Sequence, residues 1–195
     1  MTISMIDKAA EHITERIASA PETGKTYLVA IDGRCASGKT TLAALLQKQI
    51  QDCYVVHMDH FFLREEQRTK ERLEIPGGNV DHERVLADVL QPLKAGKEAQ
   101  YRVYDCGKKA LGESVRIMPG SIVIVEGSYS CHPALQACYD LRIFLTTDKE
   151  EQMNRIQKRN GPTAAEIFRS KWIPLEEMYF SAYQINKRCD MQFET

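Results

Sequence analysis

Residues 30–41 read AIDGRCASGKTT, and they lie between an apolar run at 27–31 (YLVAI) and a helical pattern at 42–50 (LAALLQKQI). Positions 33–40 fit G-x-x-x-x-G-K-[ST], a glycine-rich turn that leaves a strand and opens a helix. Its glycines let the backbone wrap closely and adopt positive φ angles, so that N–H groups point at phosphate oxygens. The stretch therefore predicts a site for a nucleotide polyphosphate.

Each residue type in this loop has a chemical task in a phosphate site. Lys39 is predicted to reach the β and γ phosphates, and the hydroxyl of Thr40 to ligate magnesium. The predicted nucleotide-binding set is Gly33, Arg34, Cys35, Ala36, Ser37, Gly38, Lys39, Thr40 and Thr41. The cofactors that follow from these roles are ATP and Mg²⁺.

The composition describes an ordinary globular chain. The 195 residues are 43% hydrophobic and 27% charged, and the formal net charge of -1 gives no basic patch for nucleic acid. No apolar run approaches the roughly 18 residues of a membrane span, and the N-terminus does not have the pattern of a signal peptide. The six cysteines fit no zinc spacing. We expect one cytoplasmic domain over residues 1–195, with a small-molecule acceptor and neither nucleic acid nor membrane as partner.

Short apolar runs alternate with helical patterns along the chain. The predicted strands are 27–32, 54–59, 122–126 and 141–145. The predicted helices are an amphipathic one within 1–20, then 40–50, 82–93, 133–137, 149–158, 163–171 and 175–187. This alternation predicts an α/β fold, in which a parallel sheet carries helices on both faces. Two strand-like runs outside the pattern, 100–104 and 114–118, predict an antiparallel hairpin.

Two predicted strands end in a carboxylate, Asp59 in the second and Glu126 in the third. Ligands of open α/β sheets bind at the carboxyl ends of the strands, so both side chains should face the loop if their strands flank the first one. Asp59 is the candidate general base, although a carboxylate in this place is often only a turn or helix cap. Either carboxylate could hold magnesium through water. His57, within the second strand, is predicted to be a core or supporting residue.

Several segments together resemble the uridine kinase and phosphoribulokinase group of P-loop kinases. They are DGRCASGKTT (32–41), HMDHFFL (57–63), GNVDHERV (78–85), YRVYD (101–105) and IVIVEGSY (122–129). Their order and spacing match across about 27–159, and 172–194 looks like the last helix and strand of that group. The resemblance implies a three-layer P-loop NTPase fold with a five-stranded parallel sheet, a hairpin excursion at about 99–119 and a helical lid at about 159–172.

The resemblance also implies roles for particular residues. Asp59 matches the aspartate that takes the proton from a sugar 5′-hydroxyl, Asp81 one that binds ribose hydroxyls, and Tyr104 a tyrosine beside the base. The expected acceptor contacts are Asp59, Phe62, Asp81, Tyr104, Glu126 and also Lys109, which the resemblance does not imply. The expected metal-site residues are Thr40, Glu126 and Asp59. For Asp81, capping of the next helix is the alternative.

Two arginines lie in the basic helix that precedes and enters the implied lid. Arg159 is expected to be catalytic together with Lys39 and Asp59, and Arg155 to contact the nucleotide. A solvated helical face is the alternative for both arginines, and the resemblance does not separate them from Lys158.

One departure from the group concerns the acceptor. Where uridine and cytidine kinases carry a histidine that reads the pyrimidine, this sequence has Lys108 and Lys109. A lysine cannot accept a hydrogen bond; it could attract an anionic acceptor or lie solvated at the hairpin tip. The sequence predicts an ATP- and Mg-dependent kinase of a small-molecule hydroxyl, most simply the 5′-hydroxyl of uridine or cytidine. The alternatives are pantothenate, a phosphopentose, glycerate or nicotinamide riboside as acceptor, or a nucleotide-dependent switch ATPase; a homo-oligomer also stays open.

Overall fold

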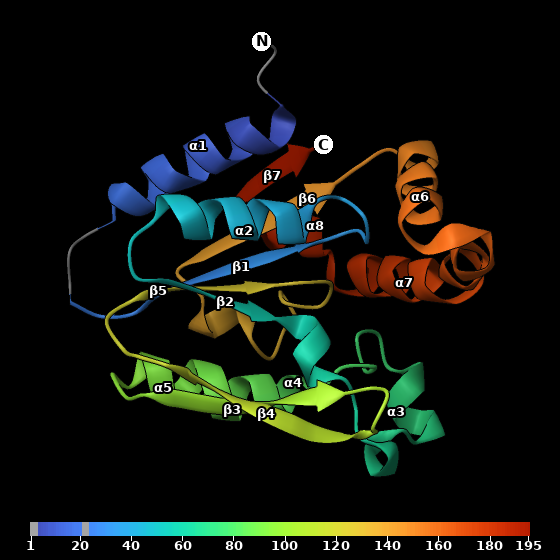
Figure 1. The fold of residues 1–195 in the computed structure, drawn as a ribbon, viewed down its shortest axis with the longest axis horizontal. Coiled ribbons are helices and arrows are strands. Elements are labelled where there is room, and N and C mark those ends of the chain that lie inside the picture. The colour runs from blue at the N-terminus through green and yellow to red at the C-terminus, as the bar shows by residue number, and fades with distance from the viewer. Residues whose placement is uncertain (1–3, 21–23) are drawn as a thin grey trace.

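A five-stranded parallel sheet forms the centre of the structure, in the order β2-β5-β1-β6-β7 (Figure 1). The computed structural model describes residues 4–20 and 24–195, so the first three residues of the predicted N-terminal helical segment lie outside it. The strands are β1 (Tyr27–Gly33), β2 (Cys53–His57), β5 (Ile122–Glu126), β6 (Leu141–Thr146) and β7 (Met191–Glu194). All four neighbouring pairs are parallel. The predicted parallel sheet is therefore confirmed.

The central strand is buried on both faces, which explains its unbroken apolar sequence. Leu28 and Ala30 belong to the hydrophobic cluster on one face, while Val29 and Ile31 belong to the cluster on the other. Helices α1 (Met5–Ala18) and α2 (Lys39–Gln49) cover the second face. The predicted amphipathic face of α1 is confirmed, because its buried residues are Ala9, Ala10, Ile13 and Ile17.

The opposite face supports a second layer that carries the hairpin. Helix α4 (His82–Val85), the π-helical turn η3 (Leu86–Leu90) and α5 (Gln91–Lys94) follow one another directly and form the predicted helical run. Strands β3 (Ala99–Asp105) and β4 (Ala110–Ile117) pair antiparallel beside it. The hairpin is confirmed, but β4 begins four residues before the predicted 114–118, because Ala110 and Leu111 continue the pairing to Asp105 and Tyr104.

Other elements also differ from the prediction. Strand β2 ends at His57, and the 3-10 helix η1 (Met58–Phe61) follows it, so Asp59 lies in a helical turn after the strand. The predicted helix at 133–137 is only a 3-10 turn, η4 (Gln136–Cys138). The short helices η2 (Glu65–Gln67) and α3 (Lys70–Glu74) were not predicted, because neither has an apolar stripe and neither contains a buried residue.

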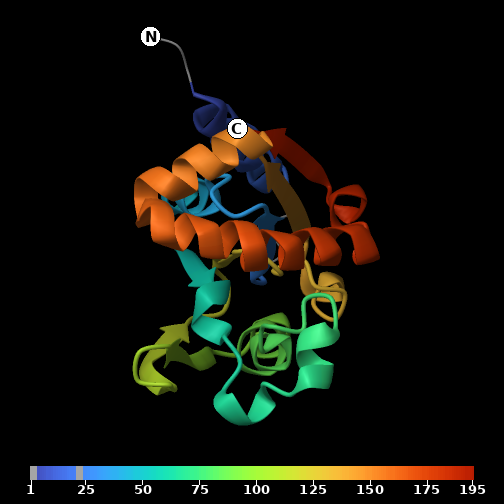
Figure 2. The ribbon, with the colours of Figure 1, turned by 90° about the vertical axis from the view of Figure 1, so that its right-hand side faces the viewer.

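The lid region consists of helices that cross in front of the carboxyl ends of the strands (Figure 2). Helix α6 (Lys149–Ile167) is interrupted at Gly161, which has φ 81° and ψ 169° and precedes Pro162. The chain continues through the π-helical turn η5 (Phe168–Trp172) into α7 (Ile173–Tyr183), and left-handed Gln184 leads to α8 (Ile185–Arg188). Among residues 4–20 and 24–195, no helix is long and apolar enough to cross a membrane.

An aromatic stack joins the hairpin layer to α7. The rings of His82 and His132 stack with centroids 3.9 Å apart, and the ring of His132 is parallel to that of Tyr179 at 6.4 Å. Burial, together with the nearby charges of His82 and Arg72, lowers the pKa of His132 to about 4. Neutral imidazole is therefore the form that this stack accommodates.

We expect protonation of His132 to destabilise the fold in acid. An unfolded histidine titrates near pH 6.5, so the unfolded chain binds more protons, and stability falls as the pH decreases from about 6.5 towards about 4. Replacing His132 by Phe keeps the ring and should remove about 1–2 kcal/mol of this pH dependence after allowance for solvent screening. Urea unfolding between pH 4 and 7 measures it, with His12→Phe on the exposed side of α1 as control. If the free energy of unfolding of His132→Phe depended on pH as steeply as that of the unaltered protein, His132 would not be the source of the acid sensitivity.

Candidate active site

The loop after β1 has the backbone that its two glycines predict. Gly33 has φ 134°, and a Cβ there would lie 1.8 Å from the carbonyl oxygen of Leu145 on β6, so no other residue fits. Gly38 has φ 90° and is the N-cap of α2. The loop therefore leads its N–H groups into the first turn of a helix, where anions are stabilised.

Asp32 fixes this loop to two other parts of the chain. Its buried carboxylate accepts hydrogen bonds from the backbone N–H groups of Gly33 (2.7 Å), Tyr129 (3.1 Å) and Cys131 (2.8 Å), and from the hydroxyl of Tyr179 (2.8 Å). Burial raises the pKa of Asp32 to about 6, and the hydrogen bonds oppose that rise. Sequence reasoning missed this role, because an aspartate that ends a strand gives no indication of where its donors lie.

The reactive side chains of the loop point inward. Lys39 is buried, and its Nζ donates to the carbonyl oxygens of Gly33 and Arg34, both at 2.8 Å. The hydroxyl of Thr40 donates to Glu126, 3.2 Å from Oε1. Because β5 pairs directly with β1, the carboxylate that ends β5 lies beside the loop, as expected from the sequence.

Asp59 and His57 complete the charged cluster. Strand β2 pairs with β5 and not with β1. Asp59 therefore follows a strand that lies one position further from β1 than the flanking position considered in the sequence analysis. His57 Nδ1 lies 2.5 Å from Glu126 Oε1, and this hydrogen bond raises the pKa of His57. Burial raises the pKa of Asp59, as does the charge of Glu126, whereas Lys39, His57 and Arg159 lower it.

The oxygen donors of this cluster fit magnesium. Thr40 supplies a hydroxyl, and Glu126 and Asp59 supply carboxylates, which are the hard donors that Mg²⁺ prefers. Within the described residues, no three His, Cys, Asp or Glu side chains form a metal-binding group. This agrees with the usual behaviour of Mg²⁺, which takes one or two protein carboxylates and completes its shell with water and substrate phosphates.

A cavity of about 890 Å³ connects the loop to Asp59 and the lid. The predicted site residues that line it are Cys35, Ala36, Gly38, Lys39, Thr40, Thr41, Asp59, Phe62, Glu126, Arg155 and Arg159. Arg155 also donates to the carbonyl oxygen of Ala36 at 3.3 Å, whereas Lys158 is exposed and does not line the cavity. The structure thus brings together the residues predicted from the loop, the two strand ends and the lid arginines.

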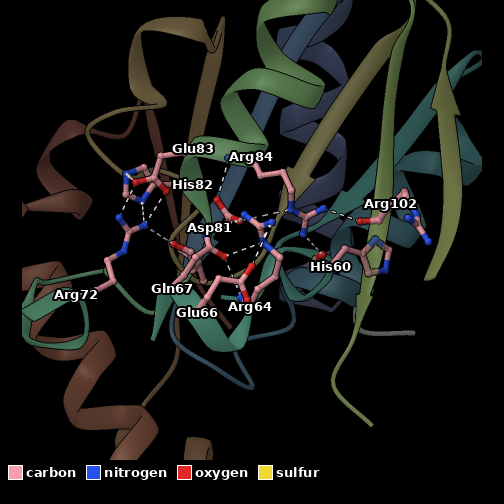
Figure 3. A network of polar contacts seen from close by, with 11 residues as sticks. His60, Arg64, Glu66, Gln67, Arg72, Asp81, His82, Glu83, Arg84 and Arg102 are labelled. Carbon is pink, nitrogen blue, oxygen red and sulfur yellow. Dashed lines mark hydrogen bonds and ion pairs between the residues drawn. The ribbon is translucent and has the colours of Figure 1, made fainter. Parts of the chain in front are cut away.

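Other predicted residues lie elsewhere. Gly33, Arg34 and Ser37 belong to the loop but do not line the cavity, and Arg34 pairs with Glu177 at 2.9 Å. Asp81 is a buried member of the polar network of Figure 3, where it accepts from Gln67 Nε2 (2.9 Å) and caps α4 through the backbone N–H of Arg84 (3.1 Å). The structure thus shows the capping role that was the alternative for Asp81, and the residue does not line the cavity.

The hairpin residues also differ from expectation. Tyr104 is 4% exposed and packed within the hairpin layer, away from the cavity. Lys109 has φ 52°, and its Nζ lies 3.3 Å from Glu65, while Lys108 pairs with Asp105 at 3.7 Å. The β4 pairing closes the turn over residues 106–109, and neither lysine lines the cavity. Cys106 is the hairpin residue that lines it.

Several cavity residues were not predicted. Asn79 lies within the segment 78–85 that carried the resemblance and Cys106 directly follows the segment 101–105, so the sequence offered a signal for both, whereas no sequence pattern marked Arg68. Phe168 and Trp172 bring apolar rings from the lid. Glu176 of α7 accepts from the N–H of Cys35 at 3.0 Å and from the hydroxyl of Ser128.

The cysteine inside the loop is not an activated thiol. Burial, together with the carboxylate of Glu176, raises the pKa of Cys35 to about 12. A thiol that stays protonated at neutral pH is a poor nucleophile.

These features define a P-loop fold in which one cavity joins the phosphate loop to Asp59, and sequence relatives of the chain carry the name uridine kinase. The chain is 26% identical over 166 residues to uridine kinase-like protein 3 of Arabidopsis thaliana. This match covers 80% of this chain and 35% of that relative. It is 26% identical over 141 residues to the uridine kinase of Macrococcus caseolyticus, which is 67% of each chain. The chain therefore spans about a third of the plant relative's length. No protein-family model matches it.

A solved structure shows the same fold. The structure described as a possible uridine kinase from Bacillus stearothermophilus superposes with a TM-score of 0.71 at 20% identity, over 97% of this chain and 100% of that one. At this identity the superposition speaks for the fold alone. The sequence relatives and the shared fold together make this chain similar to the uridine kinase-like P-loop kinases.

We expect Asp32 to be a structural requirement of the loop. Asp32→Ala leaves four donors in the interior without their acceptor, and each costs about 1–3 kcal/mol when unsatisfied. The free energy of unfolding should fall by about 3–5 kcal/mol, and for Asp32→Asn, which keeps one carbonyl oxygen, by about half as much. Urea denaturation measures both changes. A loss below about 1 kcal/mol for Asp32→Ala would show that the fold does not need the hydrogen bonds to Asp32.

Proposed function

We propose that this protein is an ATP- and Mg-dependent kinase that transfers the γ-phosphoryl group to a hydroxyl of a small molecule. The observation that supports this most strongly is the single cavity that joins the phosphate loop to Asp59. A nucleotide switch needs no such pocket beside the γ-phosphate position, whereas a kinase needs one for its acceptor. The net charge of -1 favours a small-molecule acceptor over nucleic acid, and we place the reaction in the cytoplasm.

The reaction follows from the positions of the side chains. The loop N–H groups and Lys39 hold the phosphates, and Asp59 accepts the proton of the acceptor hydroxyl as it attacks the γ-phosphorus in line. Arg159 reaches the same cavity from the lid and opposes the charge that spreads over the transferring group. Bound Mg²⁺, for which Thr40, Glu126 and Asp59 are the candidate ligands, would neutralise phosphate charge.

Two acceptor classes remain in the proposal, and different observations favour them. The names of the sequence relatives favour a nucleoside, uridine or cytidine, phosphorylated at its 5′-hydroxyl. Asp81, Tyr104 and Lys109 do not line the cavity, which weakens the case for a nucleoside acceptor. Arg68 lines the acceptor end of the cavity with Phe62 and Cys106, and a guanidinium there favours an acceptor that carries a carboxylate or phosphate.

The expected result for Asp59→Asn is a loss of kcat by about 10²–10⁴-fold, because the proton acceptor is removed. ATP binding should be retained, since the loop is untouched. ADP production with ATP and Mg²⁺ measures turnover, and calorimetric titration measures binding. Asp52→Asn is the matched control, because Asp52 is exposed in the turn before β2 and its φ of 50° suits asparagine.

The acceptor panel is uridine, cytidine, nicotinamide riboside, pantothenate, glycerate and phosphorylated pentoses. Arg68→Gln should raise the KM of an anionic acceptor several-fold and leave that of uridine unchanged. A pyrimidine nucleoside that reacts strongly and is indifferent to Arg68→Gln would select the first class. If no acceptor raises ADP production above the acceptor-free rate, the kinase proposal fails, and a switch ATPase becomes the better description.

A further inference from the structure

The first turn of α1 belongs to the wall of the active-site cavity. Ser4, Met5 and Ile6 line the same cavity as the phosphate loop. Helices α1 and α2 lie side by side with their first turns at the same end of the sheet (Figure 1). The contact is close, because a Cβ on Gly38 would lie 2.8 Å from Cδ1 of Ile6.

Helix α1 and Asp59 reach the cavity from opposite faces of the sheet. Helix α1 packs on one face, and η1, which contains Asp59, packs on the other. Asp59, Phe62 and Arg68 line the cavity on the side where the acceptor is proposed. In a phosphate loop the lysine reaches the β and γ phosphates, and the γ-phosphate must face Asp59 for transfer to occur. The remainder of a nucleotide must therefore extend away from Asp59, towards Thr41 and the first turn of α1.

A capping box and buried apolar residues hold the first turn of α1 in place. The Ser4 hydroxyl accepts the N–H of Asp7 at 3.1 Å, and the Asp7 carboxylate accepts from Ser4, which forms a capping box. Four apolar residues further along α1 are buried against the sheet. The helix thus reaches the cavity as a rigid element and presents its first side chains to it.

The chemistry of this wall suits a heterocyclic ring. Met5 is 48% exposed and Ile6 is half-buried, so both present apolar surface to the cavity. A methionine thioether packs well on an aromatic face. Thr195 and Arg155 line the cavity as well, held by bonds from Thr195 Oγ1 to the carbonyl oxygen of Ser37 (2.8 Å) and from Arg155 to Thr195 (3.1 Å).

We propose that residues 4–6 form one wall of the nucleoside subsite, in which Met5 and Ile6 pack on the base of the bound nucleoside triphosphate. The inference rests on the proposed nucleotide-dependent function and specifies a subsite that the phosphate loop does not contain. Recognition here is by apolar contact with the ring. The triphosphate itself makes no use of this wall.

Comparison of ATP with inorganic tripolyphosphate tests the subsite, because the two ligands differ only in the nucleoside. Calorimetric titration of the full chain in Mg²⁺ should show ATP binding weakened about 5–20-fold by the double variant Met5→Ala/Ile6→Ala, and about 3-fold by Met5→Ala alone. Tripolyphosphate affinity should change less than about twofold. Met118→Ala is the control, because Met118 is 54% exposed on the far hairpin.

The outcomes are distinguishable. Equal weakening of ATP and tripolyphosphate by Met5→Ala would overturn the subsite, because α1 would then act by supporting the loop. Unchanged ATP binding in Met5→Ala and in the double variant would overturn it as well. Because Ile6 contacts Gly38, the Ile6→Ala substitution could change the phosphate loop itself. The single variant Met5→Ala leaves Ile6 in place and tests the subsite without that effect. If the unaltered protein binds neither ligand, the nucleotide-dependent function itself fails and the subsite fails with it.

Discussion

The buried carboxylate of Asp32 is the constraint on which the rest of the site depends. A charge in the interior is tolerated only when donors surround it, and here three backbone N–H groups and the hydroxyl of Tyr179 do so. Those donors come from the end of β1, from the segment after β5 and from α7. One side chain therefore locks the phosphate loop, the strand end that carries Glu126 and the helix behind the lid into a single arrangement.

The strand order then decides which groups meet at the loop. With β1 between β5 and β6, the loop emerges where chain connections leave in opposite directions, which is where open α/β sheets bind ligands. Glu126 lies directly beside Thr40 because β5 is the neighbouring strand. Asp59 comes from one strand further away and reaches the cavity because η1 follows β2 immediately. Because β2 and β5 are paired neighbours, Asp59 and Glu126 line the same cavity.

The acceptor side shows where a local pattern fails to decide a role. The segment around Asp81 resembled a ribose-binding segment, yet Gln67 and the N-terminus of α4 take its carboxylate. Tyr104 was expected beside a base and is packed inside the hairpin layer. Arg68, which had no pattern to mark it, lines the cavity instead. Each difference arises because a side chain's role depends on competing partners from distant segments.

By itself, the sequence determined the elements whose cause is local. These are the phosphate loop with its two required glycines, the apolar strands of a sheet buried on both faces, the hairpin, and the helix break around Gly161. Only the tertiary structure decided how the site is completed: the donors that hold Asp32, the contact of α1 with the loop, and the choice of Arg68 over Lys109 at the cavity. The physical reason is that backbone preference and hydrophobic period act over a few residues, whereas hydrogen bonds and burial in the site join residues up to 158 positions apart.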